Sequence, residues 1–78
     1  MGRQMEIRVR LSGDLGKYFE EERRFQAELQ ATIGDLLAGL GIAEGEVGLI
    51  ALNGGLATRS AELQEGDEVQ LFRPIGGG

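Results

Sequence analysis

The residues best suited to chemistry are the glycines that end the chain, Gly76, Gly77 and Gly78, which follow an alternating segment at residues 69–73. Alternation of apolar and polar side chains over residues 69–73 predicts a β-strand, so the last ordered element leads directly into a tail without side chains. Because glycine has no Cβ, such a tail can enter a narrow channel of another protein where larger residues would collide. The terminal carboxylate of Gly78 is therefore expected to be the reactive group.

That carboxylate must be activated by another molecule before it can react. A C-terminal carboxyl group has a pKa of about 3.5, so at neutral pH it is an anion and a poor electrophile. The chain has no phosphate-binding loop, and its glycine-rich segment at residues 39–45 follows a predicted helix and has the wrong spacing for a dinucleotide fingerprint. The absence of Cys and His removes thiolate nucleophiles, imidazole bases and the usual zinc ligands. We therefore expect no intrinsically bound cofactor, no bound metal and catalysis by a partner.

Length and charge limit the remaining possibilities. The 78 residues are predicted to form one domain, residues 1–78, with a flexible glycine tail at about 74–78. A chain of this size buries only about 60% of its unfolded surface, so no deep private cavity is expected. The net charge of −5 opposes binding to nucleic acid or anionic membranes and favours a basic groove on a protein partner. No apolar run approaches the length of a membrane span or a secretory signal, which predicts a soluble cytoplasmic protein.

Hydrophobic periodicity predicts the elements that hold the tail. Apolar residues alternate with charged ones over residues 5–11 and with polar ones over residues 25–29, which predicts an antiparallel pair of strands. Thr32 can cap a helix of about three turns with Asp35 in its first turn, and Gly39 or Gly41 would end it. The apolar helical stripe is Ile33, Leu36, Leu37 and Leu40.

The rest of the chain predicts short strands and turns. Residues 47–53 are apolar enough for a strand shielded on both faces, and Asn53-Gly54 predicts a turn before a short segment at residues 56–58. Leu63 is expected to anchor a loop, and Gly66-Asp67 to form the turn before the last strand.

This β-β-α-β-(β)-β order predicts an α+β fold of the β-grasp, ubiquitin-like type, with a mixed sheet packed on one main helix. A single helix covers one sheet face, so the other face is expected to be wet and to receive the partner. Phe72 is the outward aromatic nearest the tail and the first candidate for that contact, although it could equally be an ordinary half-buried aromatic. Arg8 and Arg10 are expected on the same face if the first and last strands pair.

The order of elements, combined with Asn53-Gly54, the segment Leu-Gln-Glu-Gly-Asp-Glu-Val at residues 63–69, Pro74 and a terminal diglycine, resembles the ubiquitin-like sulfur carriers of the MoaD/ThiS family. The resemblance covers nearly the whole chain. It implies that a ubiquitin-activating-type enzyme uses ATP to adenylate Gly78 and that the product is converted to a thiocarboxylate. It also implies a sulfur-acceptor enzyme, either the large subunit of molybdopterin synthase or thiazole synthase. Two departures from the family pattern, the extra Gly76 and Arg73 before Pro74, leave the pathway open.

In this interpretation the chain is a carrier or co-substrate, and a candidate small subunit of molybdopterin synthase, rather than an enzyme. The predicted site comprises Gly78 as the acylated residue, with Gly77, Gly76, Pro74 and Phe72 as binding residues. Residues 74–78 fully extended reach at most about 17 Å. Ordering three glycines costs on the order of 3–6 kcal/mol, so the folded body must supply a contact area.

Three alternatives remain at this stage. The same carrier role could serve thiamine thiazole synthesis instead of molybdopterin synthesis. The chain could instead be a non-catalytic β-grasp interaction module with passive, frayed terminal glycines. It could also be a modifier, like ubiquitin, whose Gly78 becomes attached to a lysine of another protein.

Overall fold

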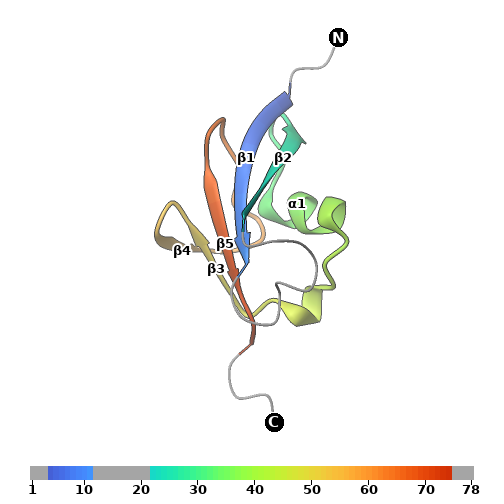
Figure 1. Cartoon of the computed structure of the whole chain (residues 1–78), viewed down its shortest axis with the longest axis vertical. Helices are drawn as coiled ribbons and strands as arrows, with labels where there is room; N and C mark the ends of the chain where they lie inside the picture. Colours follow the sequence, from blue (N-terminus) through green and yellow to red (C-terminus); the bar gives the residue numbers. More distant parts are fainter. Residues whose placement is uncertain (1–3, 12–21, 75–78) are drawn as a thin grey trace.

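A computed structural model describes residues 4–11 and 22–74. Its elements are β1 (Gln4–Leu11), β2 (Glu22–Glu28), α1 (Ile33–Leu40), the 3-10 helix η2 (Glu44–Glu46), β3 (Leu49–Leu52), β4 (Gly55–Ala57) and β5 (Glu68–Phe72). The strands form one sheet in the order β2-β1-β5-β3-β4, with α1 on one side of it (Figure 1). Strands β1 and β5 are parallel and the other neighbours are antiparallel. This is the predicted β-grasp fold, with η2 as an element that the sequence did not predict.

The core lies between α1 and one face of the sheet. Every second residue of β1 points into it, as the period-two pattern predicted, and β5 alternates in the same way. Fully burying one such aliphatic side chain stabilises the fold by about 1.5–3 kcal/mol. The largest fully buried side chains are Ile7, Val9, Ile33, Leu36, Val69 and Leu71.

Helix α1 is fixed at both ends by its own residues. The Thr32 hydroxyl accepts a hydrogen bond from the Asp35 amide at 3.2 Å, and the Asp35 carboxylate accepts one from the Thr32 amide at 2.9 Å. This reciprocal capping box confirms the predicted start. Gly41 ends the helix in the left-handed region at φ 75°. The 8 residues between these caps make just over two turns, at about 3.6 residues per turn, rather than the three predicted.

Strand β2 pairs with β1 in antiparallel register, as predicted, but it ends one residue earlier than its apolar pattern suggested. Leu29 lies beyond the strand and is 52% exposed. The chain turns at that point, because the next residue, Gln30, has φ 70° and the Glu28 carbonyl accepts the Ala31 amide at 3.0 Å. Leu29 therefore does not continue the buried face of Ala27.

The prediction that residues 47–53 form a strand shielded on both faces is wrong. Within β3, Ile50 is buried, whereas Leu49 is 45% exposed. Among the described residues only the α1 side of the sheet is covered by a helix, so a strand that is apolar on both faces leaves its other face open. This correction matters for function, because the exposed face of β3 adjoins the end of β5.

Hydrogen bonds between residues 53–54 and residues 63–69 connect two turns. Asn53 and Gly54 both have positive φ, 52° and 89°, as a tight hairpin turn between β3 and β4 requires. The Asn53 side chain donates to Asp67 Oδ1 at 2.9 Å and accepts from the Glu68 amide at 2.9 Å. Asp67 Oδ2 accepts the Gln64 amide at 2.7 Å. The two motifs thus serve turn structure, which confirms the interpretation of Asn53 and Gly54 as turn residues.

Candidate functional site

The tail begins at the end of a central strand. Strand β5 lies between β1 and β3, so its backbone is held on both sides, and its last residue is Phe72. Arg73 and Pro74 follow and are exposed. The predicted site residues Gly76, Gly77 and Gly78 lie outside the described residues, so the structure places only Phe72 and Pro74 of the predicted set.

Gly48 holds the root of the tail at close range. Its amide donates to the carbonyl of Phe72 at 2.7 Å, which ties the residue before β3 to the last residue of β5, whose pairing partner in the sheet is Leu49. A Cβ at position 48 would lie 2.5 Å from Pro74 Cα, 2.8 Å from Pro74 N and 2.9 Å from the Arg73 carbonyl oxygen. All three distances are shorter than van der Waals contact, so only glycine lets the chain pass here. Gly48 therefore fixes where residues 73 and 74 leave the sheet.

An apolar patch lies beside this exit, on the sheet face opposite α1. Leu49 pairs directly with Phe72, and Ala51 pairs with Leu56 on β4. Leu56 is 80% exposed and Leu49 45%, while Ala51 and Phe72 are half-buried. We call these four residues the outer patch. Their side chains share one face because each alternates with a residue that points to the core.

The neighbouring half of the same face is charged. Arg8 and Arg10 of β1 lie on it, as expected from the pairing of β1 with β5, but Glu68 lies opposite Arg8 and Glu22 opposite Arg10. On the β2 side, however, Arg8 lies opposite Arg24, so this half of the face mixes basic and acidic side chains, and Glu68 and Glu22 border the positive spot expected from the two arginines.

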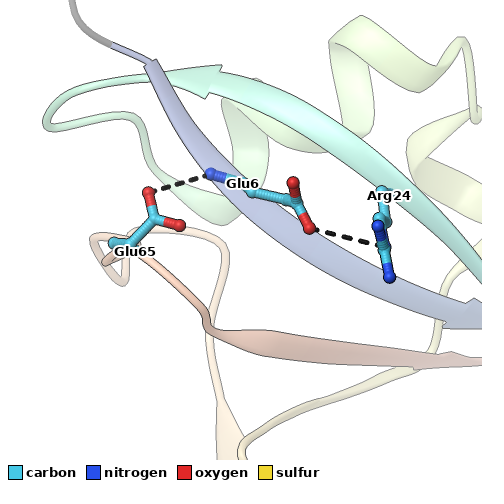
Figure 2. Close-up of polar contacts among 3 residues, drawn as sticks. All are labelled: Glu6, Arg24 and Glu65. Atoms are coloured by element: carbon cyan, nitrogen blue, oxygen red, sulfur yellow. Dashed lines mark hydrogen bonds and ion pairs between the residues drawn. The ribbon is translucent and has the colours of Figure 1, made fainter.

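The paired charges continue along β1 and β2. Figure 2 shows Glu6 of β1 between two partners: its carboxylate lies 3.4 Å from Arg24 Nε on β2, and its amide donates to the Glu65 carboxylate at 3.1 Å. The exposed Glu6–Arg24 pair contributes at most about 1 kcal/mol. The charged half is therefore expected to orient a partner more than to bind it tightly. Binding energy is expected from the outer patch, because its apolar side chains can be removed from water.

The sequence identified Phe72 and Pro74 but missed Gly48, Leu49 and Leu56. A signal for Leu49 was present, since a strand that is apolar on both faces must expose one of them in a protein with one helix. The sequence predicted Leu56 only as part of a short segment, not as an exposed residue. Gly48 belongs to no sequence motif. Its role depends on the pairing of β3 with β5, which local patterns do not reveal.

Other kinds of site find no support in the part of the chain that the structure describes. No group of three or more acidic side chains there is arranged to hold a metal ion. The Glu65 carboxylate accepts a hydrogen bond from the Glu6 amide of β1, and the Asp67 carboxylate accepts one from the Gln64 amide of the loop before β5. Among the same residues, no helix is long and apolar enough to cross a membrane.

Comparisons with solved structures place the fold among small β-grasp proteins. One chain from the protein–protein complex of subunits 1 and 2 of molybdopterin-converting factor from Helicobacter pylori is 31% identical, with a TM-score of 0.64, and the alignment covers 95% of this chain and 100% of that one. SAMP1 from Haloferax volcanii is 25% identical, with a TM-score of 0.73 and coverage of 94% and 99%. The HVO 2177 protein of the same organism is 24% identical, with a TM-score of 0.81 and coverage of 96% and 88%, and this likeness speaks for the fold alone.

A search of curated proteins gives no match. A family model, however, matches from within β1 to the end of the chain, including the two turn motifs, the outer patch and the terminal glycines. That model, described as the ThiS family, covers residues 9–78, and the chain therefore belongs to the ThiS family.

Proposed function

We propose that this protein is a sulfur carrier whose Gly78 carboxylate is adenylated by a ubiquitin-activating-type enzyme and converted to a thiocarboxylate that donates sulfur in molybdopterin synthesis. The observation that carries the proposal is the placement of the tail root. Gly48 fixes Pro74 at the end of the central strand β5, directly beside the outer patch. A partner that covers the patch therefore receives the tail at a defined point.

The outer patch can supply the contact area that the tail requires. A fully buried leucine contributes about 1.5–3 kcal/mol. Scaled by the exposures of Leu56, 80%, and Leu49, 45%, covering both contributes about 2–4 kcal/mol. This is comparable to the free-energy cost of ordering three glycines, which is on the order of 3–6 kcal/mol. Docking through the patch thus offsets most of the entropy lost when the tail is threaded.

The chemistry itself belongs to the partner. Attack of the Gly78 carboxylate on the α-phosphate of ATP gives an acyl-adenylate and releases pyrophosphate. Hydrosulfide from the sulfur source then attacks the acyl carbon of the adenylate, AMP leaves with the bonding electrons, and the terminal acyl group becomes a thiocarboxylate. With no Cys and no His in its sequence, the chain supplies neither a thiol nor an imidazole to these steps. Its contribution is to present an unobstructed acyl group.

The acceptor is proposed from the relative with the highest identity among those described above. That relative is a chain of a molybdopterin-converting factor in which two subunits form a complex. We infer that this protein likewise associates with a large subunit through its outer patch. In the alternative with a thiazole synthase as acceptor, the patch and the tail would be used in the same way.

The proposal is tested by co-expressing the full chain with a ubiquitin-activating-type enzyme from the same genome and a sulfur source, then weighing the intact protein. The expected result is a mass increase equal to the difference between sulfur and oxygen. A chain lacking Gly77 and Gly78 is the control and should not gain this mass. If the full chain also fails to gain it in the presence of an enzyme that adenylates it, the carrier role is wrong.

A second function is favoured by one comparison. The relative that is 25% identical, SAMP1, is a small archaeal modifier protein. In that role Gly78 would form an isopeptide with a lysine of a target. Denaturing gels of the cells used above would then show a ladder of larger conjugates that disappears when Gly77 and Gly78 are deleted.

A further inference from the structure

A second surface of the protein lies at the sheet edge farthest from β4. Strand β2 has a single partner in the sheet, β1. The Arg8 amide donates to the Asp67 carbonyl and the Gly66 amide donates to the Glu6 carbonyl, so these residues of β1 use their backbone groups toward β5. In an antiparallel pair, residues alternate between facing the partner and facing away. Phe25 and Ala27, which pair with Ile7 and Met5, therefore face β1.

The alternation leaves a row of backbone groups on the outside of β2. The amides and carbonyls of Arg24 and Gln26 point away from β1, toward the edge of the sheet. Such a row is a template for another strand unless it is covered, shortened or disrupted. Strand β2 is 7 residues long and contains no proline, and its charged residues, Glu22, Arg23, Arg24 and Glu28, limit which segments can pair with it. In the part of the chain that the structure describes, no strand pairs with this edge.

A groove of about 590 Å³ adjoins the C-terminal half of this edge, next to the start of α1. Its apolar lining comes from Phe25, Ala27, Leu29 and Ala31, and Leu29 is 52% exposed. Glu28 and Asp35 supply two carboxylates, and the other lining residues are glutamines. None of the described residues that line the groove is basic. The groove therefore combines apolar surface with two carboxylates beside an open strand edge, and of these the Asp35 carboxylate also accepts the Thr32 amide in the capping box.

We propose that this edge and groove bind an extended peptide segment that carries alternating apolar residues and a basic residue, added as a sixth strand beside β2. The peptide backbone would pair with Arg24 and Gln26, its apolar side chains would cover Leu29, and its cation would lie near Glu28 and Asp35. The charge of the groove selects this occupant over an acidic one. The β2 edge is the opposite edge of the sheet from β4, which carries Leu56 of the outer patch, so the proposal is independent of the tail chemistry.

The experiment titrates the isotopically labelled full chain with a blocked hexapeptide, Lys-Val-Ile-Val-Val-Lys, and follows amide chemical shifts by NMR. The expected result is a set of perturbed amides centred on Arg24, Gln26 and Leu29, with binding that weakens in salt. The charge-reversed peptide, with Glu at both ends, should bind at least tenfold more weakly. Absence of shifts with the basic peptide, or shifts centred on Leu49 and Leu56, would overturn the proposal.

A matched pair of variants tests the strand pairing itself. Gln26→Pro removes an outward amide without removing a bond to β1, a position that proline tolerates in edge strands, whereas Gln26→Ala keeps the amide. Loss of one backbone hydrogen bond should weaken peptide binding about fivefold in Gln26→Pro relative to Gln26→Ala. Equal affinities of two folded variants would refute strand addition.

A substitution at the groove tests the site without changing the backbone. Leu29→Lys should weaken the basic peptide at least fivefold, while Leu56→Lys, an equally drastic change at an exposed leucine of β4, should leave it unchanged. If Leu56→Lys weakens binding and Leu29→Lys does not, the peptide site lies on the outer patch and the proposal is wrong. Thiocarboxylate formation is a separate readout, because Leu29 lies outside the outer patch, so only Leu56→Lys is expected to slow it.

Discussion

Replacing Gly48 with alanine should displace the root of the tail while leaving the core unchanged. The new Cβ would lie 2.5 Å from Pro74 Cα, whereas carbon atoms pack best at about 3.5–4.0 Å. Pro74 must therefore move by about 1 Å or more. The obstructing atoms are backbone atoms of Arg73 and Pro74, so no side-chain rotation can relieve the contact.

The same displacement strains the 2.7 Å hydrogen bond from the Gly48 amide to the Phe72 carbonyl. Overpacking typically costs about 1–3 kcal/mol, and losing one hydrogen bond costs about 0.5–1.5 kcal/mol. Because these effects share one distortion, we expect a total loss of about 1–3 kcal/mol in the free energy of unfolding. In a domain of this size, each kcal/mol lowers Tm by about 4–8 °C.

Thermal and urea unfolding of Gly48→Ala measure this loss, and Gly45→Ala is the matched control. A Cβ at position 45 meets nothing within 4 Å, and Gly45 does not have positive φ, so this variant should stay within about 0.5 kcal/mol of wild type. Amide shifts of Phe72 and Arg73 should change in Gly48→Ala and not in Gly45→Ala. At a temperature where both are folded, only Gly48→Ala should acquire the thiocarboxylate more slowly. Equal stability and unchanged shifts at residues 72 and 73 would refute the role of Gly48.

Three further substitutions test other parts of the structure. Leu56→Arg should leave the free energy of unfolding within about 0.5 kcal/mol of wild type but slow thiocarboxylate formation. Leu29→Arg, also at an exposed leucine, should slow thiocarboxylate formation little. Mass spectrometry over time measures the rate for both variants. Asn53→Ala removes two side-chain hydrogen bonds and places alanine at positive φ, so urea unfolding should show a loss of about 1–3 kcal/mol, and no loss would contradict the bridge to Asp67. Thr32→Ala should cost about 1 kcal/mol through loss of the helix cap, while Thr32→Ser should cost only a few tenths.

The parts of the fold that the sequence predicted are those encoded by neighbouring residues. The alternation in β1, the capping box at Thr32 and Asp35, and the Asn53-Gly54 turn each depend on residues within a few positions of one another. Their geometry follows from backbone and side-chain preferences that hold before any tertiary contact forms. These elements appear in the structure essentially where the patterns placed them.

The candidate site was predicted only where it belongs to a local pattern. Phe72 was found because it alternates with Leu71 along one strand. Leu49 and Gly48 were not, because their exposure and close approach arise from the pairing of β3 with β5 and from the position of α1 on one face only. Such pairings connect distant parts of the chain, and periodicity within one segment contains no information about them.

The position of β5 explains how so small a protein can present a tail accurately. A tail that followed an edge strand would be anchored on one side, and fraying of that strand would move its root. Here β5 is paired with β1 and with β3, its residues Val69 and Leu71 are fully buried, and Gly48 continues the contact to Pro74. The outer patch is built on the same β3–β5 pair. In the proposed function, a partner that binds the patch also binds the strand from which the tail leaves, so that docking would position the tail at the same time.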